Sequence, residues 1–422
     1  MVLLTGRLPI WTYYTLGELM KRSIKLAVAA AVALSGTAAF ATNGDHLIGT
    51  GAKARGMGGV GIGMSHGAES ALTNPALISS VKGTEISFGG TIFMPDVKTT
   101  VQGTGDAQGT SKADLSVIPE VSIAQKATDN LSWGIGMFGT AGMGVDHRDM
   151  VGGMFNNFNM VTNLQLMQFA VPVAYNSNGF SIGIAPVLQY GSLDIKYTNS
   201  TTKGVAQDFG WGYNIGAAYE NSGLTVGASY KSAIDMKYDG QIAQAANVDF
   251  MLSGYTDNLE QPSEYGAGLS YKMGSHTIAA DYKRINWGSA KGYKDFNWND
   301  QNVYMIGYEF AQDGWALRAG YNHAKNPIQQ MDGNTWKGAV VNFFNLVGFP
   351  GIVETHYTLG GSVDLSKSVS LDLAYVYAPK TTTTYGTTAL TTGMTGGMFT
   401  NATAVSTEHS QQAVSAQLNY NF

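Results

Sequence analysis

The sequence has no cysteine, few charges and no long apolar run, and each absence excludes a class of protein. Without cysteine there is no disulfide scaffold, no thiol catalysis and no cysteine-bound zinc or iron–sulfur site. Charged residues make up 13% of the chain, about half of the roughly 25% found in ordinary soluble domains. The net charge of −5 at pH 7 argues against a nucleic-acid partner. Beyond the N-terminus no window offers the ~20 apolar residues of a membrane-spanning helix.

Glycine and aromatic residues are what the sequence has in excess. Glycine occupies 54 of the 422 positions, and 11% of the residues are Phe, Tyr or Trp. The mean hydropathy is close to zero, at −0.05. This combination is typical of β-structure that turns one face toward lipid.

The N-terminus has the pattern of a secretory signal peptide. A basic stretch is followed by a short apolar stretch and by small residues that end in Ala39 and Ala41. The apolar stretch is too short for a membrane anchor. We therefore expect translation to start at Met20 and the mature chain to begin at Thr42, after removal of the signal peptide within residues 1–41.

From residue 84 onward, large and small side chains alternate with the period of two that is typical of β-strands. In 131–137, for example, Leu, Trp, Ile and Met alternate with Ser and Gly. About fourteen such segments follow one another, separated alternately by short turns and long loops, as in single-chain outer-membrane barrels. The sequence thus predicts an all-β fold in which residues 84–422 form a transmembrane antiparallel β-barrel.

Both ends of this barrel sequence fall on the side of the short turns, which we place in the periplasm. The chain closes with alternating apolar residues up to Phe422, an ending that barrel-assembly machinery reads. We expect Phe422 to engage that machinery. The partners of the finished, monomeric barrel in the bacterial outer membrane are then lipid and lipopolysaccharide.

Residues 42–83 do not fit a strand. A glycine-rich run is followed by a short helical stretch that ends at Asn74 and Pro75. A segment with so few apolar residues cannot bury enough surface to fold by itself. The lumen of a barrel with this number of strands would otherwise be an open aqueous pore. We expect this segment to plug the lumen from the periplasmic side.

The plug segment resembles the N-terminal hatch of the FadL/TodX family of outer-membrane transporters for fatty acids and hydrocarbons. The residues that carry the hatch motif are Gly51, Gly56, Asn74, Pro75 and Ala76. The likeness continues at 133–136, 371–377 and Phe422, so it covers the whole mature chain. It implies a fourteen-stranded barrel with an N-terminal hatch as its gate. It also implies passive uptake of hydrophobic compounds, either long-chain fatty acids or aromatic and aliphatic hydrocarbons.

The resemblance further implies a kinked third strand that opens a lateral exit into the membrane. In this sequence the third strand is 131–141, and glycine within a strand often marks a bulge. The candidates for the kink are Gly136, Gly139 and Gly142. The alternative is that these glycines only make room in a crowded lumen.

Two long loops, 142–162 and 325–353, are unusually apolar for segments exposed at a surface. Apolar loops of this kind either cover another part of the protein or bind a ligand. We expect them to capture the hydrophobic ligand, and packing on each other as a lid is compatible with the same pattern. The candidate capture residues are Met154, Phe155, Phe158, Met160, Phe343, Phe344, Leu346 and Phe349.

Three cations lie where a carboxylate head group in the lumen would meet them: Lys196, Lys283 and Arg318. An ion-pair network within the lumen is the favoured interpretation of all three. They do not match the family's fatty-acid-coordinating cations residue by residue, which leaves aromatic or alkane cargo open.

Two enzyme motifs match by pattern alone. Residues 56–61 fit the dinucleotide-binding pattern and 63–67 fit the nucleophile elbow of hydrolases, but neither lies in the α/β unit that its chemistry requires. The His residues are scattered without ligand spacing. We therefore expect no enzyme activity, no metal and no cofactor. The alternatives to a transporter are a general porin or structural surface protein and, more distantly, an outer-membrane lipase.

Overall fold

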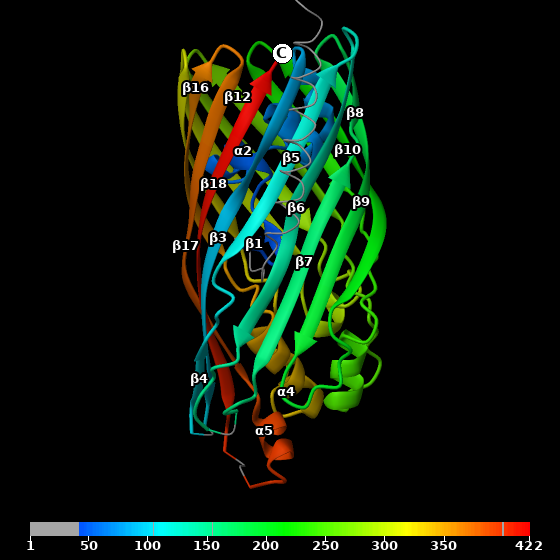
Figure 1. Ribbon diagram of the computed structural model, residues 1–422, viewed down its shortest axis with the longest axis vertical. Coiled ribbons are helices and arrows are strands. Elements are labelled where there is room, and N and C mark those ends of the chain that lie inside the picture. The colour runs from blue at the N-terminus through cyan, green and yellow to red at the C-terminus, as the bar shows by residue number, and fades with distance from the viewer. Residues whose placement is uncertain (1–41, 104, 154, 399–400) are drawn as a thin grey trace, which may run out of the picture. The chain divides into compact units, whose positions relative to one another are not determined.

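The computed structural model describes residues 42–103, 105–153, 155–398 and 401–422. The expected signal peptide, with Met20 and the cleavage site after Ala41, lies outside the described residues, and so does Met154. The described residues form a closed antiparallel β-barrel (Figure 1).

Fourteen long strands make the wall of the barrel. They are β3 (Thr84–Gln102), β5 (Ser116–Lys126), β6 (Leu131–His147), β7 (Met160–Ala170) continued by β8 (Val173–Ser177), β9 (Phe180–Lys196), β10 (Ala206–Asn221), β11 (Leu224–Lys231), β12 (Glu264–Met273), β13 (His276–Ile285), β14 (Gln301–Gln312), β15 (Trp315–Ala324), β16 (Thr355–Ser366), β17 (Val369–Gly386) and β18 (Ala404–Asn421). Each strand pairs with the next, and β18 closes the barrel on β3. The short strand β4 (Ala107–Thr110) extends the sheet beside β3. The predicted fold class is confirmed.

The alternation of side chains explains which face of each strand meets lipid. On β15 the large residues Trp315, Leu317 and Tyr321 point outward and are exposed, while Ala316 and Arg318 are buried inside. A barrel with lipid outside reverses the arrangement of a soluble sandwich, whose large side chains face inward. The period-two pattern therefore predicted both the strands and the direction of their faces.

The apolar loop between β6 and β7 is shorter than expected. Strand β6 continues to His147 and β7 already begins at Met160, so the loop covers only 148–159. Placing Met160 in a loop was wrong: it is the first residue of a strand and its side chain is buried.

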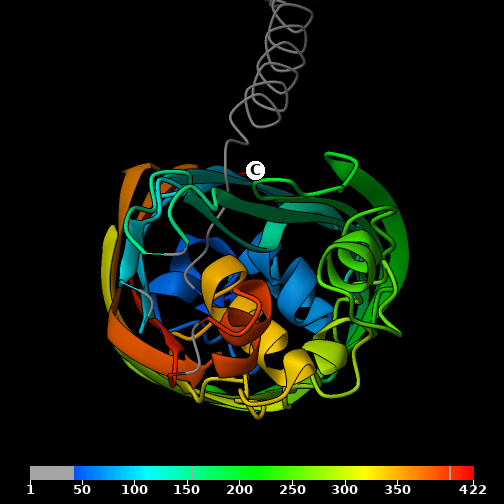
Figure 2. The ribbon, with the colours of Figure 1, turned by 90° about the horizontal axis from the view of Figure 1, so that it is seen from below.

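Residues 42–83 lie inside the barrel, as the view along its axis shows (Figure 2). The segment contains β1 (Thr42–Asn43), β2 (His46–Leu47), α2 (Gly51–Gly56), η1 (Gly67–Glu69), α3 (Ser70–Thr73) and η2 (Pro75–Ser80). Helix α3 ends at Thr73, directly before Asn74 and Pro75, as expected, and Pro75 then opens the separate 3₁₀ turn η2. Proline fits the first position of a helix, where no backbone N–H is needed.

Glycines of the wall let the backbone of this N-terminal segment lie directly on the strands. A Cβ at Gly320 would stand 2.7 Å from the Cα of Gly58, and one at Gly268 would stand 2.7 Å from the amide nitrogen of Gly63. Real Cβ atoms do not approach so closely. Part of the glycine excess thus serves the contact between the segment and the wall.

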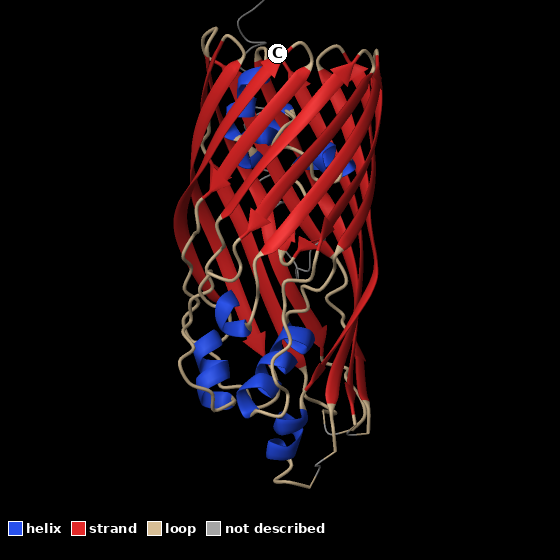
Figure 3. Cartoon of the chain, turned by 180° about the vertical axis from the view of Figure 1, so that it is seen from behind, coloured by secondary structure: helices blue, strands red, loops and turns tan. Residues whose placement is uncertain are grey.

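Short helices close the end of the barrel that carries the long loops, opposite the C-terminus (Figure 3). They are the π-helices η3 (Gln244–Asp249) and η5 (Phe344–Gly348), the 3₁₀ turn η4 (Tyr293–Phe296), and the α-helices α4 (Trp336–Phe343) and α5 (Thr388–Met394). Within the described ranges, no helix has the length and hydropathy to cross a membrane.

Candidate functional site

An ion pair joins the N-terminal segment to the wall. The Arg55 guanidinium in α2 donates from Nη1 to Glu120 Oε2 at 2.7 Å and from Nη2 to Oε1 at 2.6 Å, and Nη1 also reaches the Thr91 hydroxyl at 2.9 Å. Both charged side chains are only 2% exposed. A bidentate pair of this kind fixes orientation as well as distance.

A second attachment uses backbone amides. The Asp281 carboxylate on β13 accepts hydrogen bonds from the amides of Gly61 at 2.7 Å, Ile62 at 2.6 Å and Gly63 at 3.1 Å. Consecutive amides that converge on one carboxylate form an anion-binding nest. The C-terminal end of the glycine-rich run is therefore held by the Asp281 carboxylate on the barrel wall.

Asn74 supplies a third attachment. Its side chain accepts from the amide of Ala76 at 3.2 Å and donates to the carbonyls of Ile62 at 2.9 Å and of Ala217, on β10, at 3.3 Å. Asn74 is completely buried and takes an extended conformation just before Pro75. The Asn-Pro-Ala motif thus ties two parts of the segment to each other and to the wall.

The hydrogen-bond ladder between β5 and β6 ends within β6. It runs from Lys126↔Ser132 to Glu120↔Phe138, and beyond that pair β6 no longer pairs with β5 in the described structure. Its register against β7 shifts between Gly139 and Ala141. Ala141 then pairs with His46 of β2, so the N-terminal segment takes the place of β5 here. We name this region, 138–142, the β5–β6 break.

Of the three kink candidates, Gly139 borders the register shift. Gly136 lies in the regular ladder before it, and Gly142 follows it and donates from its amide to the carbonyl of Asp45.

An apolar pocket of about 40 Å³ lies under the long loops. It is lined by Met143, Leu193, Ile195, Ile242, Ala245, Ala246, Leu259, Tyr293, Phe296, Trp298, Phe344, Asn345 and Phe349. Both π-helices, η3 and η5, contribute to the lining, and such distorted helices are frequent at functional sites.

The polar atoms at this apolar pocket are already engaged. Asn345 Oδ1 accepts from Trp298 Nε1 at 3.0 Å, and Asn345 Nδ2 donates to the carbonyl of Phe296 at 2.8 Å. The Tyr293 hydroxyl donates to the Asp45 carboxylate. Burial raises the pKa of Asp45, which favours its neutral form.

The structure brings most of the predicted capture residues together at the long-loop end. Phe155, Phe158 and Phe343 form an aromatic cluster with ring centroids 5.1 to 5.9 Å apart. Phe344 and Phe349 line the apolar pocket, whereas Leu346 is buried elsewhere in the loop core.

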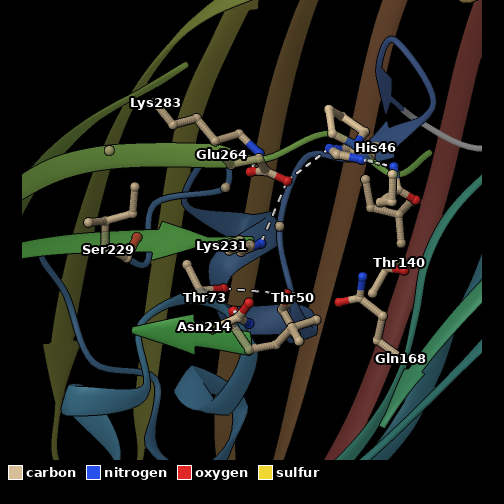
Figure 4. A pocket seen from close by; sticks show the side chains of 18 of the residues that line it. His46, Thr50, Thr73, Thr140, Gln168, Asn214, Ser229, Lys231, Glu264 and Lys283 are labelled. Carbon is tan, nitrogen blue, oxygen red and sulfur yellow. Dashed lines mark hydrogen bonds and ion pairs between the residues drawn. The ribbon is translucent and has the colours of Figure 1, made fainter. Parts of the chain in front are cut away.

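A polar cavity of about 70 Å³ lies deeper in the barrel, beside the β5–β6 break (Figure 4). Its polar lining comes from both the N-terminal segment and the wall: His46, Thr50, Thr73, Thr140, Gln168, Asn214, Ser229, Lys231, Ser232, Gln261, Glu264 and Lys283. Asp45 accepts a hydrogen bond from Tyr293, which lines the apolar pocket, and the next residue, His46, lines the polar cavity. Asp45 and His46 therefore lie between the two cavities.

Each predicted lumenal cation has an acidic partner. Lys283 reaches Glu264 at 3.0 Å, Arg318 reaches Glu309 at 2.7 Å, and Lys196 reaches Asp194 at 2.6 Å. Lys196 is half exposed at the end of its strand, Lys283 is partly buried and Arg318 is buried. Only Lys283 lines the polar cavity.

The sequence pattern did not single out Lys231 and Glu264, although they face each other across the neighbouring strands β11 and β12. The available signal was a charge on the small-residue face of each strand. In the described part of the chain no three His, Asp or Glu side chains are grouped to hold a metal ion.

A family model described as "Outer membrane protein transport protein (OMPP1/FadL/TodX)" matches residues 26–422. The structure resembles the toluene transporter TodX of P. putida, with a TM-score of 0.65 and 18% identity, over 89% of this chain and 99% of that one. It also resembles a FadL homologue of Pseudomonas aeruginosa, with a TM-score of 0.66 and 14% identity, over 90% of this chain and 100% of that one. At these identities the solved structures establish the fold.

Two curated proteins are similar in sequence. A 47 kDa outer membrane protein of Pasteurella multocida is 22% identical over 364 residues, 75% of this chain and 84% of that protein. A protein of Chlorobium limicola, described by its place in the 5′ region of a phosphoenolpyruvate carboxykinase gene, is 36% identical over 117 residues. That match spans 27% of this chain and about half, 55%, of the relative.

Proposed function

The chain belongs to the OMPP1/FadL/TodX family of outer-membrane transport proteins, and from this premise we propose that it takes up neutral hydrophobic molecules by passive diffusion. The class of cargo we favour is the hydrocarbon, aromatic or aliphatic, rather than the long-chain fatty acid. P. putida TodX, which has the same fold, is described as a toluene transporter.

The apolar pocket is the observation that carries this proposal. Its side chains offer aromatic and aliphatic surface, and its polar atoms are already hydrogen-bonded within the protein. A charged or hydroxylated group placed there would lose its hydration without gaining a partner. None of the described residues that line it is a cation, so a carboxylate gains nothing from it.

Capture and passage would follow from the arrangement of the loops. Phe158 and Phe349, which are partly exposed, would meet a molecule arriving from outside. The buried residues Phe155, Phe343, Phe344, Leu346 and Met160 would support them from within the loop core. From the pocket the cargo would pass Asp45 and His46 toward the β5–β6 break. There the absence of a β5–β6 ladder beyond Phe138 in the described structure favours lateral exit into the membrane.

The N-terminal segment would act as the hatch, with Asn74, Pro75 and Ala76 as the gate. Its attachments to the wall at Glu120 and Asp281 argue against a general porin, whose lumen is water-filled. At the other end, the backbone of Phe422 pairs with Thr84 while its side chain is 71% exposed. This exposure suits contact with barrel-assembly machinery.

Filling the apolar pocket tests the proposal. Ala245→Phe places a ring into the pocket from η3, and Val248→Phe is the matched control, because Val248 lies on the same helix with 56% of its surface exposed. We expect toluene uptake by cells that rely on this protein to fall severalfold in the first variant and to stay unchanged in the second. Undiminished uptake by an Ala245→Phe barrel with normal heat-modifiable mobility would contradict the role of the pocket.

A further inference from the structure

Within the β5–β6 break, one side of β6 has no neighbouring strand over two residues. The last pair of the β5–β6 ladder is Glu120↔Phe138, and the N-terminal segment begins to pair with β6 at Ala141. Gly139 and Thr140 lie between these two pairs, without a ladder partner on that side in the described structure. Two residues of a strand span about 6–7 Å. We call this opening the 139–140 window, and its span is close to the width of a single benzene ring.

Pro119 explains why the ladder ends at this point. Continuing the register would place Pro119 opposite Gly139, and the Pro119 carbonyl oxygen lies 3.8 Å from the position of a Cβ at Gly139. Proline has no N–H to donate, so a ladder does not continue through it on that side. On the other side of β5, Pro119 still lies opposite Gly90 of β3. The sequence thus frees β5 from β6 while β3 keeps β5 in the wall.

The Ile118 side chain fills the 139–140 window. A Cβ built on Gly139 would stand 2.5 Å from Ile118 Cγ2, closer than real Cβ atoms come. The glycine therefore leaves room for this side chain. Ile118 is 1% exposed and belongs to one buried cluster with Leu47 and Ile48 of the N-terminal segment. Both the wall and that segment hold it in place.

The inner side of the window meets the polar cavity. Gly139 and Thr140 are part of the cavity lining, and Figure 4 shows the Thr140 side chain there. Leu47 and Ile48 belong to the same lining, whereas Ile118 does not. A molecule that left the cavity through the window would therefore have to displace the Ile118 side chain.

We propose that Ile118 closes the lateral exit and sets its size limit, so that the hydrocarbons that leave are no wider than one benzene ring. This inference rests on the proposed uptake and lateral exit, and it names the subset of hydrocarbons that pass. A β-branched side chain is stiff at χ1, so a limited movement of Ile118 clears only a narrow path. Toluene and unbranched alkanes fit such a path. Mesitylene, with three methyl groups spread around its ring, does not.

Uptake of toluene and of mesitylene by cells that rely on this protein tests the size limit, after subtraction of the uptake by cells without it. In the wild type, toluene uptake should exceed mesitylene uptake severalfold. Ile118→Ala should raise the ratio of mesitylene to toluene uptake severalfold, and Ile118→Val, which removes one carbon, should give an intermediate ratio. Ile123→Ala is the matched control, because Ile123 lies on the same strand within the regular ladder. Its ratio should equal that of the wild type.

A disulfide across the window tests the closure itself, since the native chain has no cysteine. The Cβ of Ile118 lies 3.7 Å from the position of a Cβ at Gly139, and a disulfide joins Cβ atoms about 3.5–4.5 Å apart. In oxidised barrels with Ile118→Cys and Gly139→Cys, toluene uptake should fall severalfold and return on reduction. The pair Ile123→Cys and Ile135→Cys, directly opposed in the ladder of the same two strands, is the control. Its oxidation should leave uptake unchanged.

An unchanged ratio in assembled Ile118→Ala barrels, or full toluene uptake by barrels cross-linked across the window, would overturn the proposal. If Ile118→Ala does not assemble, Ile118→Val and the oxidised and reduced forms of the window disulfide decide instead. Absence of toluene uptake in the wild type would contradict the proposed function, and this inference with it. Normal wild-type uptake that neither the Ile118 variants nor the disulfide alters would remove the Ile118 filter alone.

Discussion

Arg55 pairs with Glu120, and Glu120 is also the residue of β5 at which its ladder with β6 ends. The same carboxylate therefore holds the N-terminal segment through the two Arg55 contacts and stands opposite Phe138 at the edge of the β5–β6 break. A movement of the N-terminal segment would therefore act, through Glu120, on the β5–β6 break, where we place the lateral exit.

Replacing Arg55 by Ala should loosen the N-terminal segment without unfolding the barrel. Removal of one partner from a buried ion pair costs about 3–5 kcal/mol, because the remaining charge stays buried and unpaired. The barrel ladders do not involve Arg55, so heat-modifiable mobility should persist while planar-bilayer conductance rises. Arg148→Ala is the control, since Arg148 pairs with Asp146 but is 66% exposed. Equal conductance in both variants would show that the buried pair does not seat the segment.

A side chain at Gly320 should push the segment off the wall. In Gly320→Val the new Cβ would stand 2.7 Å from the Cα of Gly58, and overpacking of this kind costs about 1–3 kcal/mol. Gly361→Ala on neighbouring β16 has a closest contact of 3.3 Å and is the control. We expect faster proteolysis within residues 42–83 of folded Gly320→Val barrels and wild-type proteolysis of Gly361→Ala. Identical cleavage of the two would argue against the close backbone contact.

Cysteine labelling should report the orientation of the barrel, because the native chain has no cysteine. In intact cells, Asn334→Cys in the loop before α4 should react with a membrane-impermeant maleimide. Asp129→Cys, in the short turn before β6, should react only after lysis. The reverse pattern would mean that the long loops face the periplasm.

The strands could be predicted because the alternation of large and small residues is visible within a single segment. The cavities could not be predicted, since their lining residues come from strands that are distant in the sequence. Residues 131–137 show their alternation without reference to any other segment. Lys231 and Glu264 are 33 positions apart and meet only because β11 and β12 pair. Helix α2 was not expected in a glycine-rich run, since its stability comes from contacts such as Arg55 with Glu120 rather than from propensity.

Rising pH should destabilise the seating of the N-terminal segment through Glu69. This carboxyl is 1% exposed and its oxygens have no hydrogen-bond partner within the described structure. Burial raises the pKa of Glu69 well above its usual range, although nearby Lys53 opposes the shift. Above the ordinary carboxyl pKa, Glu69 is ionised when the segment has left the wall, whereas the buried Glu69 of the attached segment keeps its proton. Stability then falls by about 1.4 kcal/mol per pH unit until the raised pKa is passed.

The pH dependence of bilayer conductance measures this effect. Conductance should rise with pH in the wild type and stay flat in Glu69→Gln, which cannot ionise. Glu220→Gln, at an exposed position of β10, should behave as the wild type. A rise that persists in Glu69→Gln would assign the titration to another group.

Replacing Asn74 by Ala tests whether the Asn-Pro-Ala motif gates passage. The variant loses the bond to the Ala76 amide and those to the carbonyls of Ile62 and Ala217. Each net hydrogen bond contributes roughly 0.5–1.5 kcal/mol, and leaving buried groups unpaired costs more. No strand ladder is touched, so the barrel should assemble with normal heat-modifiable mobility.

If Asn74 holds the gate, hydrophobic uptake should fall in Asn74→Ala while leak of small polar solutes rises. The fall follows because a displaced segment no longer lines the path by Asp45 and His46 that leads from the apolar pocket to the β5–β6 break, and the rise follows because water enters the space that the segment leaves. Asn221→Ala removes an exposed turn asparagine that contacts Tyr219 and should alter neither quantity. Wild-type uptake and leak in an assembled Asn74→Ala barrel would restrict the motif to a local turn, because three hydrogen bonds would then have been lost without consequence for passage.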